Sequence, residues 1–362
     1  MTKQWPIPTG GGLGVARQFF LGLAKIGLEG RDVWAVCGTD VIEVKYPETC
    51  LRLADDPHPP GSRLRTTMLQ IQAIRRLAVP GATVIAFTPF YAWPLLRIAC
   101  PDIQLVHVEQ SKGGRHHELA AFRGRFGWKE RIVQAAVALN FHFPHKIVFP
   151  SRGALSLFVE KNPSLAPVAS RKGIVIHNGV ETAPSKIERA RSEEAPFQIL
   201  SVCEDVPEKG LLDSLRTVEI LYAAGMNVEF HHFGSVRDET KRVAEGLEIP
   251  AVFHGLRPRA DILAAMQQAD LFMHLPQVAV FDLVLIEAMS AGLPVVTTPV
   301  GGNVEALGDD YPHFAGSPED AAAEIQKVTE SQKFTARTGQ ALRTRAEDNF
   351  TAVAMARGYL EI

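Results

Sequence analysis

Short apolar runs alternate with longer amphipathic stretches along most of the chain. The runs are rich in β-branched residues and are typical of buried strands, whereas the stretches repeat apolar residues at the spacing of a helix face. The predicted strands are 32–36, 83–87, 103–108, 146–150, 197–203, 227–233, 252–255, 270–275 and 295–298. The predicted helices are 15–26, 64–77, 93–98, 153–160, 211–224 and 259–268. Strands that alternate with helices predict an α/β fold with doubly wound parallel sheets.

Length and composition narrow the class of protein. The 362 residues are too many for one ordinary α/β core and suit two domains, and the net charge of −2 gives no global signal for nucleic acid. Met1 to Pro8 is polar, so no signal peptide is expected, and no apolar run reaches the ~20 residues of a spanning helix. The four cysteines are far apart and predict reduced thiols without a metal site. We therefore expect a cytoplasmic protein.

The segment 281–294 predicts a short helix with a sharp end. Asp282 suits the N-cap, because its carboxylate can accept hydrogen bonds from the free N–H groups of the first turn. Gly292 suits the C-cap, and Pro294 prevents the helix from resuming. Glu287 lies in the second turn of this mostly apolar helix, where an unpaired carboxylate is costly. In an arbitrary helix it would be a capping or surface residue.

The next segment predicts a buried strand and a glycine turn. The strand 295–298 is β-branched, and Gly301 with Gly302 turns the chain at its carboxyl end, where ligands of open α/β sheets bind. From Leu283 to Val296 the sequence resembles the donor-binding segment of retaining GT-B glycosyltransferases of the group 1, family 4-like type.

The resemblance implies how this helix binds a nucleotide-sugar. Glu287 matches the second carboxylate of the family's Glu-x7-Glu motif and is expected to hold the ribose. The backbone N–H groups of Leu283 and Val284 are expected to face the diphosphate, as suits a helix N-terminus. Two positions depart from the pattern. Ala279 replaces the first carboxylate, and Asp282 replaces a glycine beside the diphosphate, where it must turn away or be neutralised.

A second set of donor contacts is expected after the strand 197–203. The family has glycine and arginine directly after this strand and a lysine five residues later. Lys209 matches the lysine and is expected to grip the diphosphate, although an isolated lysine would be a surface residue. Cys203 and Glu204 replace the glycine and the arginine. Because a carboxylate cannot bind phosphate, half of this clamp is lost.

Other donor contacts follow by position. The segment 174–181 closely resembles the strand and loop that end the first GT-B domain, and it supplies Asn178. Gly234 follows a strand of the second domain, and Leu256 with Arg257 falls where the nucleotide base is expected.

The N-terminal half contributes further candidates. Gly12 and Gly14 belong to a glycine loop before the first helix, which resembles the loop that lines the GT-B cleft; a plain turn is the alternative. After the strand 103–108, the family has a histidine close to the transferred sugar. That position falls on Gln110 as a catalytic candidate. Three residues near it are candidate acceptor or sugar contacts, namely His107, Glu109 and Lys112. The alternative is a solvated loop that Ser111 caps.

The stretch 115–131 interleaves basic and aromatic residues. This pattern suits an anionic membrane, where each basic residue contributes ~1 kcal/mol. A solvated basic face is the alternative. The expected membrane contacts are Arg123, Arg125, Trp128 and Lys129. They would place the protein peripherally on the inner face of the cytoplasmic membrane.

We therefore expect the GT-B fold, with two Rossmann-like doubly wound domains that face a central cleft. The expected acceptor domain is 1–181, the nucleotide-sugar domain is 182–344, and a helix at about 345–362 packs back on the first domain. The resemblance implies retaining transfer of a sugar, without metal or other cofactor, in bacterial-type surface polysaccharide or glycoconjugate synthesis. The donor would be UDP- or GDP-linked and the acceptor a glycan or lipid-linked hydroxyl. The alternative is a degenerate GT-B protein that binds a nucleotide, sugar or partner enzyme without transfer.

Overall fold

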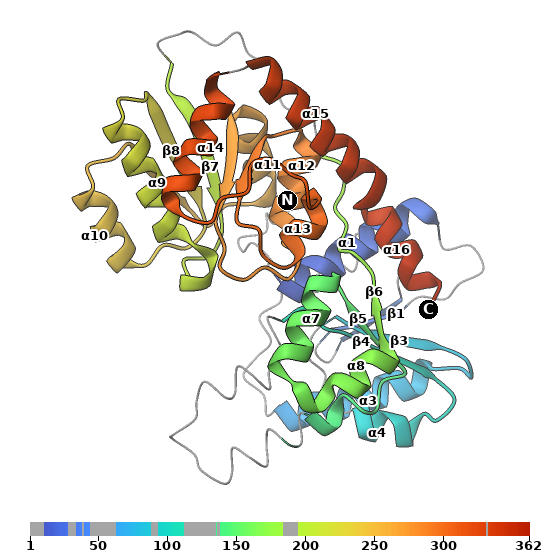
Figure 1. The fold of residues 1–362 in the computed structure, drawn as a ribbon. Coiled ribbons are helices and arrows are strands. Elements are labelled where there is room, and N and C mark those ends of the chain that lie inside the picture. The colour runs from blue at the N-terminus through green and yellow to red at the C-terminus, as the bar shows by residue number, and fades with distance from the viewer. Residues whose placement is uncertain are drawn as a thin grey trace, which may run out of the picture. The chain divides into compact units, whose positions relative to one another are not determined.

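The chain folds into two compact units (Figure 1). The computed structural model describes residues 11–27, 34–37, 40–43, 63–87, 93–111, 135, 138–183, 195–330 and 332–362. We call Gly179–Thr351 the C-terminal unit, and Thr9–Asn178 with Ala352–Ile362 the N-terminal unit.

The C-terminal unit contains a five-stranded parallel sheet in the order β11-β10-β7-β8-β9. The strands are β7 Phe197–Val202, β8 Val228–Phe233, β9 Ala251–Gly255, β10 Leu271–His274 and β11 Val295–Thr297. The helices are η2 Pro207–Lys209, α9 Leu211–Ala223, α10 Asp238–Gly246, α11 Arg259–Gln268, α12 Leu283–Ala291, α13 Gly302–Leu307, α14 Pro318–Glu330 and α15 Gln332–Asn349. The chain runs outward from β7 to β9 and then returns to the other side of β7. The strand order therefore reverses between β7 and β10.

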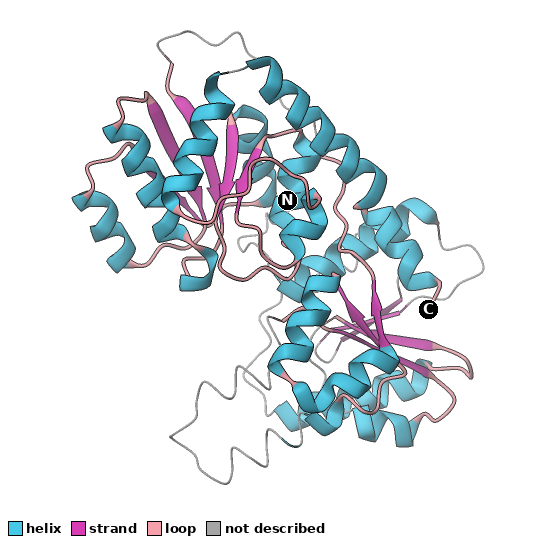
Figure 2. Ribbon diagram, viewed as in Figure 1, coloured by secondary structure: helices cyan, strands magenta, loops and turns pink. Residues whose placement is uncertain are grey.

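Helices cover both faces of this sheet because its strands are apolar on both faces (Figure 2). In β10, Leu271 and Met273 belong to the core shared with α9 and α14, whereas Phe272 belongs to the core shared with α11, α12 and α15. This alternation confirms the predicted doubly wound α/β class for the unit.

The N-terminal unit contains a four-stranded parallel sheet in the order β3-β4-β5-β6 and a separate antiparallel pair, β1 with β2. The strands are β1 Trp34–Cys37, β2 Asp40–Glu43, β3 Thr83–Ala86, β4 Gln104–Val108, β5 Lys146–Phe149 and β6 Gly173–Val175. The helices are α1 Gly11–Ile26, α3 Arg63–Leu77, α4 Trp93–Ala99, α7 Arg152–Lys161, η1 Pro163–Leu165, α8 Ala166–Lys172 and α16 Ala352–Leu360. Ser151 caps α7, as its side chain accepts a hydrogen bond from the Ala154 N–H at 2.9 Å.

The last helix, α16, packs along α1. The Tyr359 ring lies 5.3 Å from the Phe19 ring and 5.2 Å from the Phe87 ring, measured between centroids. The preceding helix, α15, belongs to the C-terminal unit, where Leu342 and Ala346 lie in the core with α12. The boundary near the C-terminus therefore follows Thr351, whereas the sequence places it at about residue 345.

Two further differences concern secondary structure. The helix α1 begins at Gly11, so Gly12 and Gly14 lie within a helix and the predicted glycine loop at these positions is wrong. Because glycine has a low helix propensity, the sequence did not predict that the helix includes these glycines. The sequence pattern also missed β2, α10 and α14. Within the described ranges, no helix is both long and apolar enough to cross a bilayer.

Candidate functional site

The reversal between β7 and β10 brings the loop after β7 and the loop after β10 together at the carboxyl edge of the C-terminal sheet. Ligands of open α/β sheets bind at such a switch point. The first loop ends with η2 and Lys209, and Gly210 follows in the left-handed conformation with φ of 69°. A Cβ at Gly210 would collide with the carbonyl oxygen of Leu275, so glycine permits the two loops to approach. The backbone hydrogen bond from Gln277 N–H to the Glu208 carbonyl, 2.9 Å, fixes them to one another.

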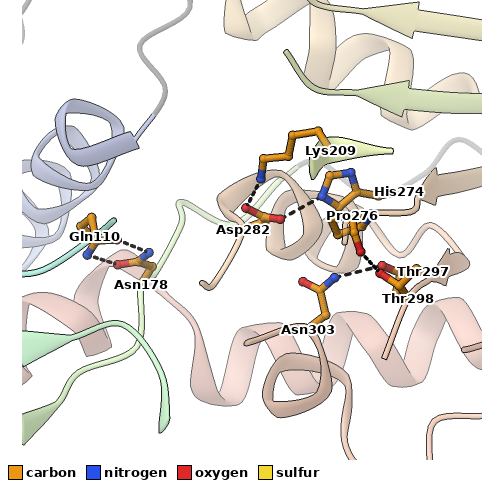
Figure 3. Close-up of polar contacts among 9 residues, drawn as sticks. All are labelled: Gln110, Asn178, Lys209, His274, Pro276, Asp282, Thr297, Thr298 and Asn303. Carbon is orange, nitrogen blue, oxygen red and sulfur yellow. Dashed lines mark hydrogen bonds and ion pairs between the residues drawn. The ribbon is translucent and has the colours of Figure 1, made fainter. Parts of the chain in front are cut away.

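Lys209, Asp282 and His274 form one polar chain at this edge (Figure 3). The Lys209 ammonium donates to Oδ1 of Asp282 at 2.6 Å, and Nε2 of His274 lies 2.9 Å from Oδ2. The Asp282 side chain is 15% exposed and the His274 side chain 1%. Lys209, at 20% exposed, is the member of the chain most open to solvent.

The environment keeps Asp282 ionised. Burial by itself raises the pKa of its carboxyl, but the hydrogen bond from His274 and the charge of Lys209 outweigh burial and hold the pKa well below its ordinary range. The predicted role of its carboxylate in capping α12 is wrong, since the side chain makes no capping hydrogen bond. Two better partners, a cation and an imidazole, compete for the same oxygens. Asp282 is the N-cap residue by backbone only.

Glu287 faces a cation as well. The residue is 9% exposed on α12, and its Oε1 accepts a hydrogen bond from Nε of Arg259 at 2.7 Å. Nη1 of Arg259 lies 3.8 Å from Oε2 of Glu181. The pairing offsets the cost of burying a carboxylate in an apolar helix.

The loop before α12 is held by the glycine turn after β11. The Gly302 N–H donates to the Ala279 carbonyl at 3.1 Å, and a Cβ at Gly301 would collide with that same oxygen. Ala279 is 2% exposed, so its backbone anchors the loop and its position offers no carboxylate. At the base of the turn, the buried Asn303 amide donates to the Thr297 hydroxyl at 3.1 Å (Figure 3).

The two replaced positions, Cys203 and Glu204, follow β7, and the other donor candidates of this unit follow β8 and β9. Burial raises the pKa of the Cys203 thiol to about 12, so it stays protonated at neutral pH. Glu204 is exposed. Gly234 donates its N–H to the Gly255 carbonyl at 3.0 Å. The remaining donor candidates, Leu256 and Arg257, are exposed and lie in the connection between β9 and α11.

In the N-terminal unit, the end of β4 carries a buried polar cluster. Oε2 of Glu109 lies 3.3 Å from Nε2 of His107, and Oε1 accepts hydrogen bonds from the Ser111 N–H at 2.9 Å and its hydroxyl at 2.5 Å. His107 and Glu109 are each 6% exposed, which contradicts the solvated-loop alternative for these two residues. Burial opposes ionisation of Glu109, but its hydrogen bonds from His107 and Ser111 prevail and lower its pKa.

Gln110 and Asn178 bind one another through their amides (Figure 3). Each side-chain NH₂ donates to the other side-chain oxygen at 3.1 Å, which joins the segment after β4 to the segment after β6. The structure thus pairs two residues that the sequence placed in the site separately. Lys112, Arg123, Arg125, Trp128 and Lys129 lie outside the described residues.

Arg259 and His274 were not among the site residues predicted from the sequence. A histidine at the carboxyl end of an apolar strand was a readable signal for His274. Arg259 had no signal, because its partner Glu287 lies 28 residues later. Within the described ranges, no group of three or more metal-ligating His, Cys, Asp or Glu side chains lies close enough to hold an ion.

Comparison with known proteins agrees with this architecture. Residues 184–345 match the model of the family "Glycosyl transferases group 1". The glycogen synthase of Mycobacterium tuberculosis strain H37Rv is 27% identical over 209 residues, covering 55% of this chain and 49% of that protein. The amylovoran biosynthesis glycosyltransferase AmsK of Erwinia amylovora is 26% identical over 190 residues, covering 49% and 46%. These matches span about half the length of each curated relative.

Solved structures resemble most of the chain. Anabaena HepE in complex with UDP-glucose has a TM-score of 0.67 at 19% identity, covering 98% of this chain and 96% of that one. Sucrose-phosphate synthase from Thermosynechococcus elongatus has a TM-score of 0.60 at 16% identity, covering 84% and 79%. At these identities the likeness establishes the fold, which is the GT-B fold of glycosyltransferases. The chain is therefore similar to the glycosyl transferases group 1 family over residues 184–345, which lie within the C-terminal unit.

Proposed function

We propose that the protein transfers a sugar from a nucleotide-sugar to a hydroxyl of a glycan or lipid-linked acceptor, with retention of anomeric configuration. The observation that carries the proposal is the position of Lys209 beside Asp282, the N-cap residue of α12, at the sheet edge where β7 and β10 diverge. The same helix carries Glu287 one turn further on. A cation, free helix N–H groups and a carboxylate are the chemical groups that a nucleoside diphosphate needs.

In this proposal the diphosphate binds Lys209 and the N–H groups of Leu283 and Val284. The ribose binds Glu287. With a helical rise of 1.5 Å per residue, Glu287 lies about 5 Å further along the axis of α12 than Leu283 and Val284. The base lies near Leu256 and Arg257. Gly234 and Asn178 complete the donor contacts.

The chemistry follows from where charge develops. As the acceptor oxygen bonds to the anomeric carbon, the bond from that carbon to the phosphate oxygen breaks, the hydroxyl proton passes to the departing phosphate oxygen, and the nucleoside diphosphate leaves. Lys209 and the helix N–H groups stabilise the negative charge on the leaving group, which is the work that a metal ion does in other transferases. We propose that no metal is needed. His107, Glu109, Gln110 and Lys112 are the proposed contacts to the sugar and acceptor.

The relatives support a UDP-linked donor and a carbohydrate acceptor. Solved complexes of HepE hold UDP-glucose, and the curated relatives are named for glycogen and amylovoran synthesis. A GDP-linked donor is the alternative. We also propose bacterial-type polysaccharide or glycoconjugate synthesis on the cytoplasmic side, with 123–129 at an anionic membrane surface.

A second candidate, a nucleotide- or sugar-binding protein without transfer, has its own support. Lys209 is held by Asp282, Ala279 offers no carboxylate, and Glu204 stands where the family has arginine. These three residues weaken the donor site without removing Glu287.

Donor turnover separates the two candidates. The wild type and the variants K209A and E287Q are incubated with UDP-glucose, UDP-N-acetylglucosamine and GDP-mannose, with and without EDTA. A bacterial lipid extract supplies acceptors, and NMR follows nucleotide release and the anomer of the product. We expect release from one donor series, unchanged by EDTA and reduced about 100-fold or more in K209A. Release from none of the donors, with nucleotide binding seen by calorimetry, would favour the second candidate.

A further inference from the structure

We propose that Arg259 is a specificity-determining residue of the donor site, which binds a ribose hydroxyl together with Glu287 and thereby selects ribonucleotides over 2′-deoxyribonucleotides. The inference rests on the proposed function, since it concerns the nucleoside part of the same site. It assigns a second ribose contact to a residue that the family resemblance does not mark.

Arg259 joins two segments that surround the proposed nucleoside position. It is the first residue of α11, two residues after Arg257, and its side chain reaches α12. Its Nε donates to Oε1 of Glu287 at 2.7 Å, and its Nη1 lies 3.8 Å from Oε2 of Glu181. The guanidinium therefore fixes the Glu287 carboxylate in one orientation.

The pair leaves one donor and one acceptor unused. Among the described residues, nothing accepts a hydrogen bond from Nη2 of Arg259, although this atom is buried. Likewise, no described residue donates to Oε2 of Glu287. A buried cationic donor without a partner is costly, so a ligand that supplies the acceptor gains binding free energy at this point.

A hydroxyl group is the chemical match for such a pair. It donates one hydrogen bond and accepts others, so one ribose hydroxyl can donate to Oε2 of Glu287 while it accepts from Nη2 of Arg259. Both bonds involve a charged partner and are therefore strong. Loss of the hydroxyl would leave Nη2 of Arg259 and Oε2 of Glu287 without partners, and sites of this kind discriminate strongly.

Calorimetric titration with UDP and 2′-deoxy-UDP tests the inference on the full-length protein. The variants are R259Q and R259K, and the control is R216Q, because Arg216 is 64% exposed and pairs with Glu219 on α9. We expect the wild type and R216Q to prefer UDP by about tenfold or more, as expected for hydrogen bonds to charged groups. In R259Q we expect about tenfold weaker UDP binding and a preference below about threefold.

Stability is measured alongside affinity. If R259Q melts far below the wild type, the inference is tested with R259K. The lysine ammonium keeps the positive charge but lacks the planar fork of donors that serves the carboxylate and the hydroxyl together, so the preference for UDP should fall in R259K too. An undiminished preference for UDP in the folded variant overturns the inference and leaves the proposed function intact. Failure of the wild type to bind UDP, or GDP and ADP titrated in the same way, would contradict both this inference and the proposed function.

Discussion

The charged residues at the carboxyl edge of the C-terminal sheet are held in pairs. Lys209 contacts Asp282 and Arg259 contacts Glu287, at 2.6 and 2.7 Å. A diphosphate that binds Lys209 must therefore compete with a carboxylate that is already in place. In the proposed donor site, Asp282 would thus be an internal competitor for the diphosphate of the donor.

The substitution D282N tests this competition. Removing the negative charge frees Lys209, so we expect nucleoside diphosphates to bind about fivefold more tightly, equivalent to ~1 kcal/mol. The same change should lower the free energy of unfolding by about 1–3 kcal/mol, because His274 and Lys209 lose a charged partner. Calorimetry and urea unfolding measure the two effects, which have opposite signs. Weaker binding in D282N would instead make Asp282 a donor contact.

The stability effect of Asp282 also has a pH signature. Its folded-state pKa lies below the ordinary value of about 4, so the stabilisation is complete above that range and is lost only as the pH falls through the depressed value. The stability difference between wild type and D282N should therefore be constant from about pH 5 to 9 and shrink in stronger acid. A difference that already fades near pH 6 would contradict an ionised, paired carboxylate.

Single site residues could be predicted from the sequence, but the residues that they contact could not. Lys209 and Glu287 are recognisable because each stands at a fixed spacing from a strand or within a motif. Their contacts, Asp282 and Arg259, lie 73 and 28 residues away and depend on how the loops fold. The expected capping role of Asp282 failed for the same reason.

Among the elements, the glycine turn after β11 determines where the loop before α12 lies. Gly301 adopts φ of 46° and packs against the Ala279 carbonyl. A side chain there meets two obstacles, a strained backbone and a collision, and each has a separate cost.

The substitutions G301A and G225A separate these costs. Gly225 has φ of 80° with no atom within 4 Å of its missing Cβ, so G225A reports backbone strain alone, about 1–2 kcal/mol. For G301A we expect about 1–3 kcal/mol more, from overpacking, together with loss of nucleotide binding as the loop moves. Urea unfolding and calorimetry give both values. Equal losses of stability would mean that the loop yields freely to the added methyl group.

Element prediction succeeded where apolar periodicity was strong. The helix 259–268 has the predicted ends, and the strands β7, β8 and β10 lie within a residue of theirs. It failed where polarity or glycine hides the pattern. The helix α10 is largely charged, and α1 begins in a run of glycines that reads as a loop.

For the whole molecule, two parallel sheets were predictable because strands alternate with helices throughout. The sequence did not predict that the chain crosses from one unit to the other after Thr351, because residues 345–362 read as one amphipathic segment. Only the structure divides this segment between α15, which packs on α12, and α16, which packs on α1.

The proposed donor site is tested by calorimetric titration of the purified protein with UDP, GDP and ADP and the matching nucleotide-sugars. We expect selective micromolar binding of one nucleotide series, abolished by E287A, because Glu287 is the proposed ligand of the ribose that all donors share. Binding that persists unchanged in E287A would contradict the ribose assignment. Binding of no nucleotide at all would contradict the proposed donor site.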